Sequence, residues 1–197
     1  MSVEPPPGLA RVSRDPAELR RVFGTFATGV TVLTAHGTEP CGMTANSFAS
    51  VSLDPALALV CVKPGSAVHE AAVTGGGFAV SVLSAEQEDL ARHFADNDRP
   101  RGEKGFAGVT WRPGRHTRAP LIEGGLGWLE CALATVHDAG DHAILVGSVL
   151  ECGLGPADGG LLFFRGRFGN CAEPPPRDLT RGPLRAEPSP AAPRPRG

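Results

Sequence analysis

Residues 41–53 hold an unusual concentration of small polar side chains in a stretch that is otherwise apolar. No aspartate or glutamate interrupts it, and its polar members are Thr44, Asn46, Ser47, Ser50 and Ser52. Small side chains let a ligand approach the backbone, and hydroxyls, amides and N–H groups offer hydrogen bonds at short range. The stretch suits a flat heterocycle with carbonyl and ring-nitrogen edges. An edge strand whose hydroxyls meet water is an equally good interpretation of these residues alone.

A second candidate site lies where an apolar run ends in a loop and a helix begins. Residues 57–62 are continuously apolar, which predicts a strand buried on both faces. Lys63 follows it, and Ser66 is a suitable N-cap for a helix that extends to about Val73. Free N–H groups at that helix N-terminus, beside Lys63, can hold a phosphate. An ordinary strand–turn–helix connection is the alternative interpretation.

The third candidate is Gly140-Asp141-His142, a turn that precedes an apolar run. This position places His142 at the beginning of a predicted strand, near the rim of a barrel. The imidazole can face a ligand there, or it can simply cap the turn. A lone histidine is more often structural than catalytic, so the motif alone decides nothing.

The elements that must position these groups begin with a helix. Asp15 is the predicted N-cap, Pro16 the first helical residue, and Glu18 completes an arrangement like a capping box. The apolar spacing continues to Phe26, and Gly29 is the predicted end of the helix. A second capping box at residues 84–87 predicts another helix.

The remaining pattern predicts mainly β structure. We expect a long hairpin from residues 127–136 and 142–150, a polar excursion at 96–120 around a short strand at 109–111, and further strands at 30–35, 78–83 and 161–164. About seven strands and three helices result, and they do not alternate strictly. The pattern therefore favours an antiparallel, Greek-key-like β-barrel with peripheral helices over a doubly wound parallel sheet.

Composition narrows the class of protein. The chain has 197 residues and a formal net charge of −2, so no strong field attracts nucleic acid or a membrane. No apolar run approaches the length of a membrane span. The first residues show no cationic segment followed by an apolar one, so we do not expect a signal peptide. Five cysteines, with no CxxC pair, indicate reduced thiols and a cytoplasmic protein.

The two ends differ in composition from the rest of the chain. Residues 1–14 contain three consecutive prolines and no periodic pattern, so we expect a flexible N-terminal arm. Residues 174–197 contain eight prolines and five arginines, which predicts a disordered tail. The folded domain is therefore expected at residues 15–173.

Several familiar catalytic motifs are absent. No GxGxxG follows a strand, and the chain has no Walker A, GxSxG or HExxH sequence. The six histidines are not spaced like zinc ligands, so no metal site is expected. The candidate chemistry rests on the three stretches above.

Together, five motifs in order resemble one family, the short-chain flavin reductases, whose flavin reductase-like domains form an FMN-binding split barrel. The resemblance spans about residues 15–170. It is carried by Phe26-Ala27-Thr28-Gly29-Val30, Gly42-Met43-Thr44-Ala45-Asn46-Ser47-Phe48, Gln87 with Leu90-Ala91 and Phe94, Gly140-Asp141-His142, and Phe164-Arg165-Gly166-Arg167-Phe168.

The resemblance implies a homodimer of six-stranded split barrels with flavin at the dimer groove. It further implies that NADH or NADPH reduces FMN or FAD by hydride transfer, and that reduced flavin passes to a partner monooxygenase. The cofactor carries the chemistry in such enzymes, and the protein positions it. No acid–base pair is then required.

The resemblance also assigns roles to residues of this chain. The isoalloxazine and ribityl chain would be lined by Thr44, Ala45, Asn46 and Ser47. The same wall would continue through Ser50, Val51 and Ser52. The phosphate end would be formed by Cys61, Val62, Lys63, Ser66 and Ala67. His142 would face the nicotinamide and the flavin, and the pocket would be closed by Arg165 and Phe168.

Two alternatives to a flavin reductase stay open. One is a flavin-binding carrier or sensor that does not turn over NAD(P)H. The other is a flavoenzyme of the pyridoxamine-phosphate oxidase type, which also uses a split barrel. The Gly140-Asp141-His142 motif favours the reductase.

Overall fold

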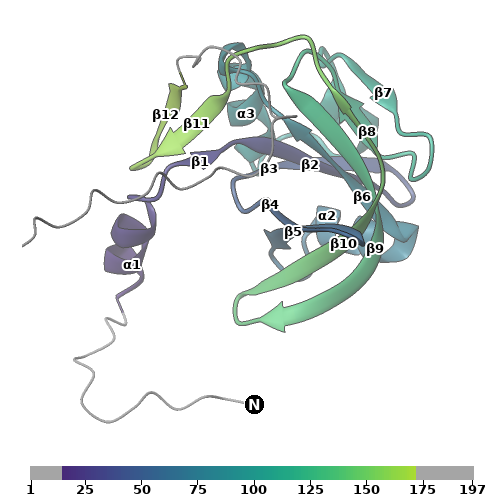
Figure 1. Cartoon of the computed structure of the whole chain (residues 1–197), viewed down its shortest axis with the longest axis horizontal. Helices are drawn as coiled ribbons and strands as arrows, with labels where there is room; N and C mark the ends of the chain where they lie inside the picture. The colour runs from purple at the N-terminus through teal and green to yellow at the C-terminus, as the bar shows by residue number, and fades with distance from the viewer. Residues whose placement is uncertain (1–14, 172–197) are drawn as a thin grey trace, which may run out of the picture.

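The computed structural model describes residues 15–171 of the chain, and Figure 1 shows the arrangement of its elements. Within these residues there are twelve strands in three sheets, together with three α-helices. Every neighbouring pair of strands is antiparallel. The predicted antiparallel, mainly β fold is therefore confirmed. The arm and the tail that we predicted lie outside the described residues.

The largest sheet has seven strands, one more than the resemblance implied. They are β2 (Thr31–His36), β3 (Pro40–Ala45), β4 (Ala49–Leu53), β5 (Ala56–Val62), β6 (Gly77–Val82), β9 (Gly127–Ala139) and β10 (His142–Leu154). Their order across the sheet is β3-β2-β6-β9-β10-β5-β4, which leaves β3 and β4 at its two edges. The stretch rich in Ser and Thr thus runs from one edge strand to the other.

Two smaller sheets complete the β structure. One has the order β1-β11-β12, from β1 (Thr28–Gly29), β11 (Leu161–Phe164) and β12 (Arg167–Asn170); the other pairs β7 (Trp111–Pro113) with β8 (Pro120–Ile122). The predicted strand at 161–164 is confirmed. The short strand of the polar excursion begins two residues later than predicted.

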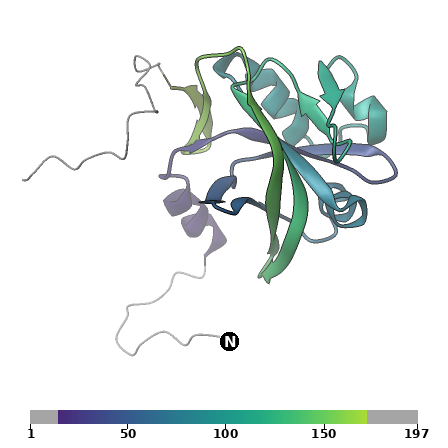
Figure 2. The ribbon, with the colours of Figure 1, turned by 45° about the vertical axis from the view of Figure 1, so that its right-hand side comes forward.

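The predicted hairpin of β9 and β10 is confirmed and is longer than expected. Both strands have thirteen residues and pair from His142↔Ala139 to Leu154↔Gly127, with two register shifts. Gly140 has a φ of 75°, a left-handed conformation that glycine adopts without steric cost, and so allows the turn. In Figure 2 the hairpin curves across the whole sheet.

Helix α1 (Pro16–Phe23) begins where the sequence predicted, because Asp15 Oδ1 accepts a hydrogen bond from the Ala17 N–H at 2.9 Å. It ends at Phe23 rather than at Gly29. Gly24 is the C-cap, and Thr28 and Gly29 pair with β11 instead. Pairing with a distant strand therefore overrides the helical apolar spacing.

The other helices follow their predicted caps. Helix α2 (Ala67–Gly75) has Ser66 as N-cap, whose hydroxyl accepts from the His69 N–H at 3.3 Å. The Ser84 N–H donates to Gln87 Oε1 at 3.0 Å ahead of α3 (Glu88–Ala95). Two short 3-10 helices, at Ala85–Gln87 and Gly102–Phe106, were not predicted. No helix within residues 15–171 is long and apolar enough to cross a bilayer.

The main core lies against one face of the seven-stranded sheet, around Leu33, Val60, Phe78 and Leu145. A second cluster joins α3 to the small sheet through Phe94, Phe106 and Leu161. Strand β5 alternates between buried and partly exposed residues. The prediction that it is buried on both faces was wrong, because only one of its faces meets the core.

Candidate functional site

The link between β3 and β4 is fastened to β5 by one side chain. Ser47 Oγ donates to the Cys61 carbonyl at 3.1 Å and accepts from the Cys61 N–H at 3.0 Å. A hydroxyl can do both at once, so Ser47 replaces a backbone partner for Cys61. This contact brings together two stretches that the sequence singled out separately.

Thr44 and Ala45 are held by contacts within the protein. The Thr44 hydroxyl donates to the Ala91 carbonyl of α3 at 2.6 Å, so it offers a ligand only its acceptor lone pairs. Ala45 is buried, and its carbonyl accepts from the Thr31 hydroxyl at 2.8 Å. Both residues therefore help to hold in place residues 44–52, which we call the polar wall.

The rest of the wall is open to solvent. Asn46, Ser50 and Val51 are exposed, and Ser52 is partly exposed. The register of β4 against β5 shifts between Ser50 and Ser52, which places Val51 in a β-bulge. Bulges commonly re-aim side chains beside binding sites and twist an edge strand away from further pairing. Polar groups on this edge are thus available to a ligand.

The loop from β5 to α2 presents a positive charge beside a helix N-terminus. Lys63 is exposed, its carbonyl accepts from the Ser66 N–H at 3.1 Å, and Gly65 has a φ of 73°. Ala67 is exposed at the first position of α2. The side chain of Val62 is 0% exposed and packs in the core, so only its backbone can reach a ligand.

His142 lies beside this loop. Ala143 pairs with Val62, so the next positions along the two strands are His142 and Lys63. Asp141 Oδ1 is 2.9 Å from His142 Nδ1, and this hydrogen bond and the imidazole's charge lower the pKa of Asp141. With Nδ1 donating to Asp141, a neutral His142 keeps Nε2 as an acceptor. The side chain is 41% exposed.

Arg165 lies in the turn between β11 and β12, and Phe168 lies on β12. Both are next to helices. Phe168 packs on Phe163 with ring centroids 5.3 Å apart, and the Arg92 guanidinium lies 4.9 Å from its ring. The Arg165 N–H donates to the Gly24 carbonyl at 2.7 Å, at the end of α1. Sequence reasoning did not find this contact with α1.

Three cavities of the described chain lie away from the polar wall. Volumes of about 290, 390 and 460 Å³ are found beside Trp128, beside Cys41, and between α1 and Arg165. Of the predicted residues, only Ala67 and Arg165 line any of these three. Asn46, Ser50 and Lys63 line none of these three cavities, and all three are exposed in the single chain.

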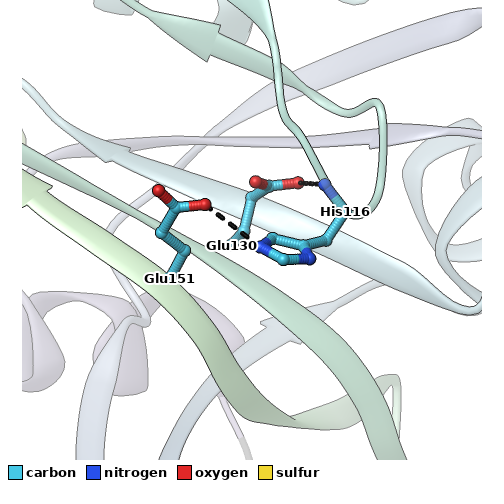
Figure 3. A group of neighbouring side chains, drawn as sticks. All are labelled: His116, Glu130 and Glu151. Atoms are coloured by element: carbon cyan, nitrogen blue, oxygen red, sulfur yellow. Dashed lines mark hydrogen bonds and ion pairs between the residues drawn. The ribbon is translucent and has the colours of Figure 1, made fainter.

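Figure 3 shows a separate cluster of titratable groups that the sequence did not predict. Potential ligand atoms of His116, Glu130 and Glu151 lie within 4.8 Å of one another. Glu130 is fully buried, and its carboxylate accepts four hydrogen bonds, three from backbone N–H groups of residues 115–117 and one from the Thr117 hydroxyl. Burial alone raises its pKa, but these donors outweigh burial and lower it. These hydrogen bonds occupy the lone pairs of the Glu130 carboxylate. Glu130 therefore anchors the loop of residues 115–117 and does not serve as a metal ligand.

Neither Cys41 nor Cys131 is a reactive nucleophile. Burial raises the pKa of Cys41 to about 11 and that of Cys131 to about 12. Thiols with raised pKa values stay protonated near neutral pH and react slowly. The site offers hydrogen bonds, one amine and one imidazole, which suits binding and positioning a cofactor.

Comparison with known proteins decides the family. The model of the flavin reductase like domain matches residues 23–172. The chain belongs to the flavin reductase-like domain family. The resemblance found in the sequence is thus confirmed, and the split-barrel fold with it.

Individual relatives agree with this assignment. An NADH-dependent FAD reductase of Streptomyces globisporus is 50% identical over 163 residues, which cover 83% of this chain and 90% of that protein. The reductase subunit HsaB of a flavin-dependent monooxygenase of Mycobacterium tuberculosis is 39% identical over 157 residues, covering 78% and 81%.

Solved structures support the same family assignment. BorF, the flavin reductase component of a bacterial two-component tryptophan halogenase, has a TM-score of 0.77 and 45% identity, and the match covers 81% of this chain and all of BorF. The Streptomyces globisporus NADH:FAD oxidoreductase SgcE6, solved with NAD and FAD fragments, has a TM-score of 0.75 and 47% identity, covering 83% and 98%.

Proposed function

We propose that this chain is an NAD(P)H-dependent flavin reductase that supplies reduced FMN or FAD to a partner monooxygenase. The observation that carries the proposal is the family match over residues 23–172, with relatives named as NADH-dependent flavin reductases and as reductase components of monooxygenases. The geometry agrees, because the site holds polar and cationic groups that can bind a nucleotide.

The residues of the site fit a flavin nucleotide. Lys63 and the first N–H groups of α2 can hold a phosphate, since a cation and a helix N-terminus both favour negative charge. Asn46 and Ser50 leave hydrogen-bonding groups exposed, Asn46 in the link between β3 and β4 and Ser50 on β4. When bound, the flavin accepts a hydride from the nicotinamide.

The chain's own contribution to the reaction is positioning. Aligning two bound nucleotides converts an encounter in solution into a reaction within one complex, which can lower the barrier by about 7–11 kcal/mol. Ser47 holds the wall on β5, and Asp141 orients the His142 imidazole beside Lys63. In this proposal His142 Nε2 faces the nicotinamide and helps to fix its orientation.

The active form in this proposal is a homodimer with the flavin in the groove between subunits. Helix α1 has no buried residue, and Phe23 and Phe26 are 70% and 76% exposed. Leu53, at the end of the wall strand β4, is 95% exposed. Figures 1 and 2 show α1 and β4 on the same side of the molecule. A second copy would cover these apolar groups and complete the open site.

A cytoplasmic location is also part of the proposal. All five cysteines are free thiols, which fits a reducing compartment.

Steady-state oxidation of NADH and NADPH with FMN, FAD and riboflavin tests the proposed activity. We expect oxidation that requires added flavin, with a preference for one nicotinamide nucleotide. Flavin that stays bound at one equivalent through purification, without any NADH or NADPH oxidation, would overturn the reductase in favour of a flavin carrier.

A further inference from the structure

A cavity of about 460 Å³ lies between the end of α1 and the turn that joins β11 to β12. It is lined by Arg20, Arg21, Gly24, Thr25, Arg165 and Gly166. Half of these lining residues are arginines, and none is acidic. The cavity is therefore cationic, and it lies outside the polar wall described above.

The two walls of the cavity are fixed to each other through their backbones. The Arg165 N–H donates to the Gly24 carbonyl at 2.7 Å, and a Cβ added to Gly24 would lie only 3.6 Å from Arg165 Cα. The last turn of α1 is closed in turn by the Gly24 N–H, which donates to the Arg20 carbonyl at 2.9 Å. The arginines of α1 are thus held at a defined place relative to Arg165.

The turn at Arg165 has a left-handed backbone conformation. Arg165 has a φ of 49° and Gly166 a φ of 76°, so both residues of this tight turn are left-handed. Gly and Asn are preferred at such positions, and another residue costs about 1–2 kcal/mol. The guanidinium packs over the Phe164 ring, 5.2 Å from its centroid. This turn and the ring contact keep Arg165 among the residues that line the cavity.

The charges of the cavity have no protein counter-ion among residues 15–171. The three ion pairs of that part of the chain involve Arg92, His116 and His142. Arg20, Arg21 and Arg165 take part in none of them. Like charges that share one cavity repel each other, and a bound anion relieves that repulsion.

We propose that this cavity binds the phosphate groups of a dinucleotide and that Arg20, Arg21 and Arg165 discriminate dinucleotides from phosphate-free flavin. Guanidinium groups present forked donors that match phosphate oxygens and keep their charge at any working pH. The inference rests on the proposed function, because FAD and NAD(P)H are the dinucleotides that such an enzyme meets. Of these three arginines, sequence reasoning placed only Arg165 in the site.

The test compares nucleotides that differ in phosphate content. KM is measured for FAD, FMN and riboflavin at saturating NADH, and for NADH at saturating riboflavin, in the wild type, the double variant Arg20→Gln/Arg21→Gln, and Arg165→Gln. Arg115→Gln/Arg118→Gln removes two exposed charges from another loop and is the matched control. We expect KM of one dinucleotide to rise about tenfold or more in the cavity variants, while KM of riboflavin changes less than twofold. Inorganic pyrophosphate should compete with that dinucleotide in the wild type.

The outcomes separate the sources of phosphate. A rise confined to FAD assigns the cavity to the flavin, and a rise confined to NADH assigns it to the nicotinamide nucleotide. An unchanged KM for both, or an equal rise for riboflavin, overturns the proposal. If the wild type oxidises no NADH, the proposed function fails, and equilibrium binding of FAD and riboflavin still tests the cavity.

Discussion

Ser47 and Cys61 exchange two hydrogen bonds, one in each direction, between a serine hydroxyl and a strand backbone. The pair joins the end of β3 to β5 at the point where the polar wall meets the loop of Lys63. Ser47, which the sequence analysis assigned to ligand contact, thus also has a structural role. The same side chain cannot donate its single hydroxyl proton to both Cys61 and a ligand.

Ser47→Ala is expected to lower stability and flavin affinity together. It leaves the N–H and carbonyl of Cys61 without their partner, which costs about 1–3 kcal/mol. Urea denaturation with and without FAD measures the loss. Ser50→Ala, at an exposed position of β4, should change stability by less than about 0.5 kcal/mol. Equal stability of the two variants would contradict the role given to Ser47.

Glu130→Gln is expected to lower stability at neutral pH by about 1–3 kcal/mol, because a buried carboxylate that accepts four hydrogen bonds is replaced by an amide that also donates. The pKa of Glu130 is lowered in the folded protein, so its contribution is full above the unfolded pKa and is lost as pH falls through the folded pKa. The difference between wild type and variant should therefore shrink as pH falls below about 4.3.

Thermal unfolding of both proteins from pH 7 to pH 3 measures this difference. Glu151→Gln is the control, since its partly exposed pair with His116 contributes at most about 1 kcal/mol. A difference that grows toward low pH would show that the sign of the pKa shift is wrong.

Elements specified by neighbouring residues could be predicted from the sequence. The side chains of Asp15 and Ser66 cap helices by accepting from backbone N–H groups two or three residues away, and Gly140 closes the turn between β9 and β10. Features that depend on distant partners could not. Strand β12 is short and exists through pairing with β11, and α1 ends early because Thr28 pairs with that same strand.

The same distinction between local and distant partners applies to the candidate site. The stretches around Ser47, Lys63 and His142 were found from residue types, and β5 brings them together. The contact of Arg165 with Gly24 was missed, because it depends on which helix lies opposite the turn. The spacing of residues in the sequence does not show which distant residues are in contact.

Removing residues 174–197 is expected to leave flavin reduction and melting temperature unchanged. The composition of this segment, with eight prolines and few large apolar residues, cannot offset the entropy lost on ordering it. Truncation after Glu173 followed by assay and thermal unfolding measures both quantities. A large loss of either would show that the tail packs on the domain or covers the site.

Phe23→Glu is expected to weaken the proposed homodimer, because it places a charge on the exposed apolar face of α1. Desolvating that carboxylate at an interface should raise the dimer dissociation constant about tenfold or more. Sedimentation equilibrium of wild type and variant measures the change, with Arg115→Gln as a surface control. A wild type that stays monomeric at micromolar concentration would contradict a flavin site between subunits.

Anaerobic stopped-flow reduction of FAD or FMN by NADH measures whether flavin is reduced beside His142. We expect His142→Ala to slow reduction by roughly ten- to a thousandfold, while flavin affinity changes less. His137→Ala removes another exposed histidine of the same hairpin and should keep the wild-type rate. A folded His142→Ala protein that reduces flavin at the wild-type rate, with a loss of only about 1 kcal/mol in stability, would contradict the account and leave His142 as a turn cap.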